Sequence, residues 1–132
     1  MKAGLEQAGI QYIHVPQQDY PKVSKLFSTL DLYLITSRQE GGPKAVLESM
    51  ASGVPLVTTR VGHAMDIVKH GQNGWMVDVE DVHGLAESVL KVYRSNAEML
   101  RSVLNAGRAT AEVHSYENQL PLWAKFMKGF VE

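Results

Sequence analysis

Between positions 37 and 53 the chain reads SRQEGGPKAVLESMASG. This segment follows an apolar run at 32–35, whose length and flanking residues predict a buried parallel strand. Pro43 suits the first position of a helix and Gly53 suits its end. The sequence therefore predicts a strand, a glycine-rich turn and a helix in direct succession.

The turn has the chemistry of a site for a phosphorylated sugar, because Glu40 is expected in it and Glu48 on the helix that follows. Backbone N–H groups at a helix N-terminus favour anions, whereas carboxylates accept hydrogen bonds from hydroxyls. Gly41 and Gly42 lack Cβ and let a ligand approach the backbone. The same pattern also fits an ordinary strand-to-helix connection in which Lys44 and Glu48 form only a surface ion pair. The residues alone leave both interpretations open.

The flanking sequence predicts further strands and helices in alternation. The expected elements are, in chain order, a helix at 1–8 ended by Gly9, a strand at 11–15, a helix at 20–30, the strand at 32–35, a strand at 54–58, a short helix at 63–69 and a strand at 75–77. Strand, helix and strand in this order form the repeating unit of a parallel sheet. An α/β fold is therefore expected.

The remainder of the chain is predicted to be helical. Asp81 is expected to cap one helix, and Ser95 with Glu98 is expected to form a capping box that begins a second. This second helix is expected to end near Val113, and a third is expected at 116–130.

The last predicted helix carries apolar side chains at helical spacing, namely Leu120, Trp123, Met127 and Phe130. Pro121 is expected either to kink this helix or to mark its true start. Because the chain is small, it is not expected to cover so much apolar surface, and the stripe is predicted to pack across an interface.

Composition indicates one ordinary soluble domain. The chain has 132 residues, 45% of them hydrophobic and 20% charged, and its net charge of −1 argues against nucleic acid as a partner. It contains no cysteine, and its five histidines lack the spacing of metal ligands, so no metal site is expected. No apolar run reaches about 18 residues, and a cytoplasmic location is expected.

Glu40 and Glu48 are separated by seven residues, and this spacing resembles the Glu-x7-Glu signature of retaining glycosyltransferases of the GT-B fold, group 1 family. Other residues resemble, in order, the rest of that family's C-terminal donor-binding domain: Val61-Gly62, Asp66-Ile67-Val68, Gly71 to Val77, Asp81 and Leu85-Ala86. The resemblance covers roughly residues 1–130. Several linked motifs make it far more specific than the two glutamates alone.

The resemblance implies a three-layer, doubly wound, Rossmann-like parallel sheet. Residues 1–132 would form a partial nucleotide-sugar-binding domain that lacks its first strands and the N-terminal acceptor domain, and this chain alone is expected to be inactive. The implied reaction is retaining transfer of a sugar from a nucleoside diphosphate donor to an unknown acceptor. The donor is a substrate, and no cofactor is expected.

The resemblance also implies roles for individual residues. Donor binding falls on Glu40, Gly41, Gly42, Lys44, Ala45 and Glu48. Glu40 would be the catalytic residue that contacts sugar hydroxyls, Glu48 would contact the ribose, and the other four would offer backbone contacts. Many family members carry an aromatic residue where Gly42 stands, so the identity of the sugar stays open.

The strand order of such folds, 3-2-1-4-5-6, predicts an incomplete sheet here. The resemblance aligns 11–15 with the third strand and 32–35 with the fourth, so the first two strands are missing between them. Because unpaired edges invite pairing with another chain, a homodimer or a rearranged N-terminal strand is expected. Contact with a membrane surface is expected only through the absent N-terminal domain.

Two other functions fit parts of the sequence. The first is a non-catalytic nucleotide-sugar-binding or interaction module. The second is a receiver-type signalling domain, but such a domain needs clustered acidic residues after its first strand, and positions 14–18 contain none. A P-loop enzyme is excluded because the Gly-x-x-x-x-Gly-Lys-Ser/Thr pattern is absent. Thr58 and Thr59 are expected to serve packing. His63 fits either a ligand contact or an ordinary structural role.

Overall fold

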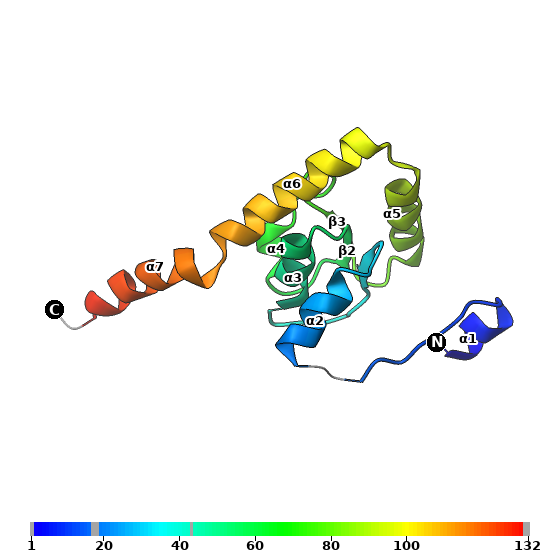
Figure 1. Cartoon of the computed structure of the whole chain (residues 1–132), viewed down its shortest axis with the longest axis horizontal. Coiled ribbons are helices and arrows are strands. Elements are labelled where there is room, and N and C mark those ends of the chain that lie inside the picture. The colour runs from blue at the N-terminus through cyan, green and yellow to red at the C-terminus, as the bar shows by residue number, and fades with distance from the viewer. Residues whose placement is uncertain (1, 17–18, 43, 131–132) are drawn as a thin grey trace.

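The computed structural model describes residues 2–16, 19–42 and 44–130 (Figure 1). Pro43, the expected first residue of a helix, lies outside the described residues. The helices are α1 (Lys2–Gln7), α2 (Tyr20–Phe27), α3 (Lys44–Ser52), α4 (Ala64–Ile67), α5 (Val82–Arg94), α6 (Ala97–Val113) and α7 (Tyr116–Lys128). The strands are β1 (Tyr33–Ile35), β2 (Leu56–Thr59) and β3 (Trp75–Val77).

The three strands form one parallel sheet in the order β1-β2-β3. In its register Leu34 lies opposite Val57, and Val57 lies opposite Trp75. Parallel neighbours cannot be joined by a tight turn, so α3 connects β1 to β2 and α4 connects β2 to β3. The predicted strand-helix-strand unit is confirmed.

Two apolar clusters lie on opposite faces of the sheet. One contains Ile35, Val46, Met50, Leu56, Ala64, Ile67, Val68 and Met76, and joins the sheet to α3 and α4. The other contains Val57, Trp75, Val92 and Val103, and joins the sheet to α5 and α6. Helices therefore cover both faces, and the predicted three-layer α/β architecture is confirmed.

The predicted strand at 11–15 is wrong. Residues 11–15 are extended but belong to no strand of the described chain, and the Ile13 side chain is 81% exposed. A β-favouring composition does not make a strand where no neighbouring strand supplies hydrogen-bonding groups.

The predicted capping box of Ser95 and Glu98 is also wrong. Helix α6 is capped by Asn96, whose Oδ1 accepts a hydrogen bond from the Met99 N–H at 2.8 Å. Ser95 instead belongs to the end of α5, where its Oγ donates to the carbonyl of Lys91.

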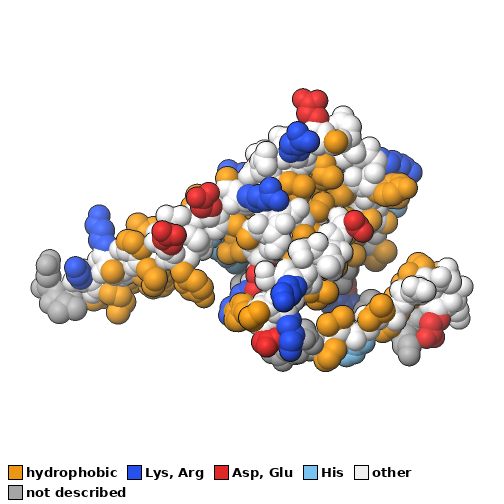
Figure 2. Space-filling model, in the orientation of Figure 1, with side chains coloured by type: hydrophobic (Ala, Val, Ile, Leu, Met, Phe, Trp, Pro, Cys, Tyr) orange, Lys and Arg blue, Asp and Glu red, His pale blue; other side chains and the backbone are white. Residues whose placement is uncertain are grey.

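The last helix, α7, extends away from the rest of the molecule (Figure 1). It begins at Tyr116 after the cap residue Ser115, so Pro121 lies inside the helix and does not mark its start. Figure 2 shows apolar side chains along one side of α7. Trp123 is 59% exposed, and Met127 and Phe130 are also exposed. The subunit's own core does not cover this stripe, and its expected partner surface stays a prediction.

The two tryptophans allow a matched test of this division between core and surface. Trp75 is fully buried on β3, so Trp75→Ala is expected to lower the free energy of unfolding by about 3–5 kcal/mol. Trp123→Ala is expected to change it by less than about 1 kcal/mol, because the side chain packs little. Urea unfolding followed by far-ultraviolet circular dichroism measures both. Equal losses in the two variants would contradict the assignment of the core.

Candidate functional site

All three parallel strands end at the same edge of the sheet, where open α/β folds bind ligands. Two ion pairs tie the loops that follow the strands together. Arg38 Nε lies 2.9 Å from Glu80 Oε1, and Arg60 Nε lies 2.9 Å from Asp78 Oδ1. The loops after β1 and β2 are thus each linked to the loop after β3.

The six predicted donor-binding residues lie in and directly after the turn that follows β1. Gly41 and Gly42 are exposed, and a Cβ built on either would meet no atom within 4 Å. Helix α3 begins at Lys44 and Ala45, so backbone N–H groups of its first turn face the region of the turn. The turn is therefore open to an approaching ligand, as the predicted donor-binding role requires.

Glu40 and Glu48 both act on one phenol, that of Tyr33 on β1. Burial is the main cause that raises the pKa of Tyr33, and the negative charges of Glu48 and then Glu40 raise it further. The Tyr33 ring also packs against Phe27, with ring centroids 5.0 Å apart. The negative charges of both carboxylates thus disfavour ionisation of the same phenol. The sequence pattern identified Tyr33 only as a strand residue.

Lys44 does not form the surface pair with Glu48 that the alternative interpretation proposed. Its Nζ donates to the Tyr20 hydroxyl at 3.1 Å, and this hydrogen bond is the main cause that raises the Lys44 pKa. Among the described residues no ion pair joins Lys44 to Glu48. The Glu48 carboxylate is thus left available for another partner.

The backbone of the turn is held by the loop that follows β2. The His63 N–H donates to the carbonyl of Gly41 at 3.2 Å. Gly62, with φ of 44°, packs so closely that a Cβ there would collide with the carbonyl oxygens of Glu40 and Gly41. The His63 ring instead contacts Asp66, with Nδ1 3.2 Å from Oδ2. It is therefore the backbone of His63 that touches the turn.

Two hydroxyls extend this support to the Glu40 side chain. Ser37 Oγ donates to Glu40 Oε1 at 2.8 Å. Thr59, which is 1% exposed at the end of β2, donates from Oγ1 to the carbonyl of Ser37 at 2.7 Å. Thr59 was expected to serve packing alone, and its hydroxyl contact with Ser37 was not anticipated because 22 residues separate the two.

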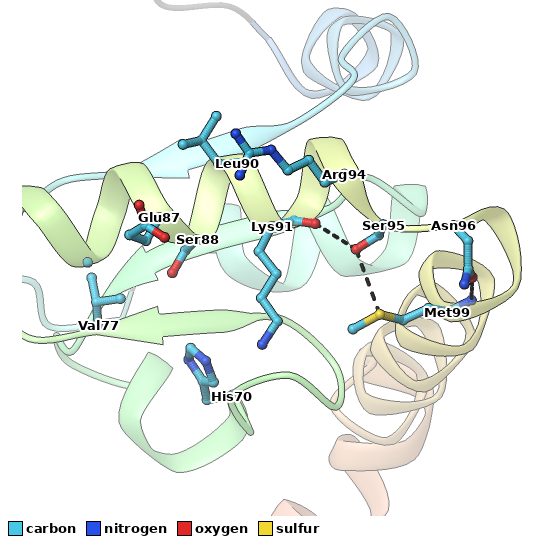
Figure 3. A pocket seen from close by; sticks show the side chains of 11 residues that line it. His70, Val77, Glu87, Ser88, Leu90, Lys91, Arg94, Ser95, Asn96 and Met99 are labelled. Carbon is cyan, nitrogen blue, oxygen red and sulfur yellow. Dashed lines mark hydrogen bonds between the residues drawn. The ribbon is translucent and has the colours of Figure 1, made fainter.

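A second hollow, of about 650 Å³, lies between α5, β3 and the start of α6 (Figure 3). The Lys91 side chain extends toward His70 in it. The His70 ring forms a hydrogen bond with the backbone of Met76, with Nδ1 2.8 Å from the Met76 carbonyl oxygen. None of the six predicted donor-binding residues lines this hollow. It is separate from the turn after β1.

The described residues contain no group of three or more His, Cys, Asp or Glu side chains placed to hold a metal ion. In the same part of the chain, no helix has both the length and the apolar character needed to cross a membrane.

The sequence model of the family described as "Glycosyl transferases group 1" matches residues 2–110. The chain belongs to this family. Among curated group 1 relatives, the N-acetyl-alpha-D-glucosaminyl L-malate synthase of Bacillus anthracis is 33% identical over 102 residues, which are 72% of this chain and 27% of the relative. The chain thus spans about a quarter of that relative's length.

Solved structures of glycosyltransferases share the fold. A glycosyltransferase from Rickettsia africae superposes with a TM-score of 0.87 at 17% identity, covering 99% of this chain and 35% of the other. The Anabaena protein HepE in complex with UDP-glucose superposes with a TM-score of 0.71 at 21% identity, covering 83% of this chain and 30% of the other. These likenesses establish a partial match to the GT-B architecture.

The contact of Gly62 with the turn of this group 1 domain can be tested with two alanine substitutions. Gly62→Ala places a Cβ at positive φ and against two carbonyl oxygens, so we expect a loss of at least about 2 kcal/mol in the free energy of unfolding. Gly41→Ala enters open space and is expected to change it by about 0.5 kcal/mol or less. Thermal melts compare the two variants. A Gly62→Ala variant as stable as the parent would contradict the close packing.

Proposed function

We propose that this chain is the donor-binding domain of a retaining glycosyltransferase that takes a sugar from a nucleoside diphosphate and transfers it to an acceptor. Because the chain spans only about a quarter to a third of its relatives, the activity of the whole enzyme is part of the proposal. The observation that carries it is the arrangement at the start of α3. There Glu40 in the turn, the N–H groups of the first turn of α3 and Glu48 on that helix follow β1 at the carboxyl edge of the sheet, where open α/β folds bind ligands.

The N-terminus of α3 supplies the electrostatics that a diphosphate needs. Backbone N–H groups of Gly41, Gly42, Lys44 and Ala45 are the predicted donors to the sugar or to an anionic group, and the helix dipole places partial positive charge in the same region. Breaking the bond between sugar and diphosphate leaves negative charge on the leaving group. Donors that are already oriented stabilise this charge without rearrangement.

The two carboxylates supply the acceptors that sugar hydroxyls need. The Glu40 side chain is exposed, and Ser37 binds only one of its two oxygens. Its second oxygen remains for a hydroxyl of the transferred sugar, which makes Glu40 the proposed catalytic contact. Glu48 lies about one turn into α3 and is half-buried, and its charge raises the pKa of Tyr33; this position suits the ribose of the nucleotide.

The comparisons support this assignment in general terms. HepE has been crystallised with UDP and with UDP-glucose, and it shares the fold of this chain. The Bacillus anthracis relative is named as a synthase of N-acetyl-alpha-D-glucosaminyl L-malate. A nucleotide sugar is therefore the proposed substrate class here, whereas neither the sugar nor the acceptor is assigned.

Glutamine substitutions test the two carboxylates. Glu40→Gln and Glu48→Gln keep the side-chain shape but remove a charged acceptor, so each is expected to weaken donor binding by about 1.5–3 kcal/mol. Glu117→Gln on α7 is the matched control and should bind like the parent chain. Titrations of the ¹⁵N-labelled chain with UDP-, GDP- and ADP-glucose, followed by amide shifts in residues 41, 42 and 44–48, give the affinities. Equal affinity in all variants, or no donor that shifts these amides, would contradict the proposal.

We also propose that two copies of the chain associate through β1. In the described chain β1 pairs only with β2, and Leu34 is 43% exposed. It lines a hollow of about 860 Å³ together with apolar side chains of α5 and polar residues that include Arg38 and Glu80. The unpaired edge of β1 can form backbone hydrogen bonds with a strand of another chain, and the adjacent apolar side chains can pack against that chain. This homodimer would bury both.

Leu34→Lys tests the association because it puts a charge at the centre of the proposed contact. The parent chain is expected to sediment as a dimer at micromolar concentration, and Leu34→Lys as a monomer. Leu26→Lys on α2 is the control, since Leu26 is 37% exposed and does not line this hollow. Analytical ultracentrifugation distinguishes the species. A monomeric parent chain would rule out this association.

A further inference from the structure

We infer that Ser37 is a positioning residue for Glu40, and that Thr59 in turn holds Ser37 in place. The inference rests on the proposed role of Glu40 as the residue that contacts the sugar. It assigns the ordering of the Glu40 side chain to two hydroxyls, those of Ser37 and Thr59.

The first step is the buried hydroxyl of Thr59. Thr59 ends the central strand, and a valine of nearly the same shape would fill its space equally well. A buried hydroxyl is costly unless it is hydrogen-bonded, and this one is bonded to the Ser37 carbonyl at 2.7 Å. The hydroxyl of the neighbouring Thr58 donates to the carbonyl of Thr59, within the same strand. Thr59 is therefore the residue that joins the rigid centre of the sheet to the loop after β1.

The second step is the hydroxyl of Ser37. With its carbonyl fixed by Thr59, Ser37 donates from Oγ to Glu40 Oε1 at 2.8 Å. The carbonyls of Glu40 and Gly41 are fixed independently by the close contact of Gly62 and the N–H of His63. Backbone and carboxylate of Glu40 are thus each held by separate contacts.

The consequence concerns an exposed glutamate, which otherwise samples several rotamers. A side chain that is ordered before the ligand arrives loses less conformational entropy on binding. Because Ser37 takes Oε1, the other oxygen of Glu40 is the one presented to a sugar hydroxyl. The geometry of a binding contact depends on such supporting hydrogen bonds.

The test measures the Glu40 rotamer and donor affinity separately. Three-bond couplings from the Glu40 backbone N and carbonyl C to Cγ report χ1 in the labelled full chain without any ligand. The parent chain and Ser37→Thr should give couplings of a single rotamer, whereas Ser37→Ala should give averaged values. Thr59→Val should also give averaged values, and Thr59→Ser, which keeps the hydroxyl, should restore the single rotamer.

Titration with UDP-glucose supplies the second readout. Ser37→Ala is expected to bind about 3- to 10-fold more weakly than the parent, and Ser37→Thr to bind equally well. Averaged couplings with this loss of affinity would support the inference. Unchanged couplings in Ser37→Ala would overturn it, as would averaged couplings with undiminished affinity. If the parent chain binds no donor while the couplings behave as expected, the proposed function fails and the contact between Ser37 and Glu40 stands.

Discussion

The fold depends on the burial of β2 on both faces. Its four residues, Leu56 to Thr59, are all buried, and each of its edges carries a parallel ladder. Such a strand can be apolar nearly throughout, because neither face meets water. The helices that connect it to β1 and β3 must then lie on the sheet, and the loops at its carboxyl end must meet. The position of the candidate site follows from this one strand.

Local signals in the sequence predicted much of this arrangement. Gly53 ends α3 with φ of 70°, and its N–H bonds the carbonyl of Met50, as a glycine after a helix commonly does. Asp81 caps α5 by accepting the Gly84 N–H at 2.8 Å. Both features involve residues within a few positions of each other, so the pattern of residue types contains the information. The same holds for the turn that carries Glu40.

Other features could not be read from local patterns. Whether residues 11–15 form a strand depends on a neighbour elsewhere in the fold, and Ser95 and Asn96 compete as adjacent cap residues until the end of α5 is known. The supports of the turn come from the loop after β2, about 20 residues further along the chain. Gly62 belongs to a recognised motif, but only the close approach of two carbonyl oxygens explains why a side chain is excluded there. The sequence pattern therefore identified the candidate residues but not the long-range contacts that hold them in place.

The exposed stripe on α7 has a consequence for how that helix gains its stability. A helix of 13 residues is near the length at which an isolated helix is only marginally stable in water. The hydrogen bond from the Asn118 N–H to Ser115 Oγ stabilises its first turn, while the apolar side chains beyond it contribute little packing energy. Docking of this face would therefore add order to α7 and bury apolar area in the same event. Helix formation and association are then linked equilibria, and a marked decrease in heat capacity would accompany both.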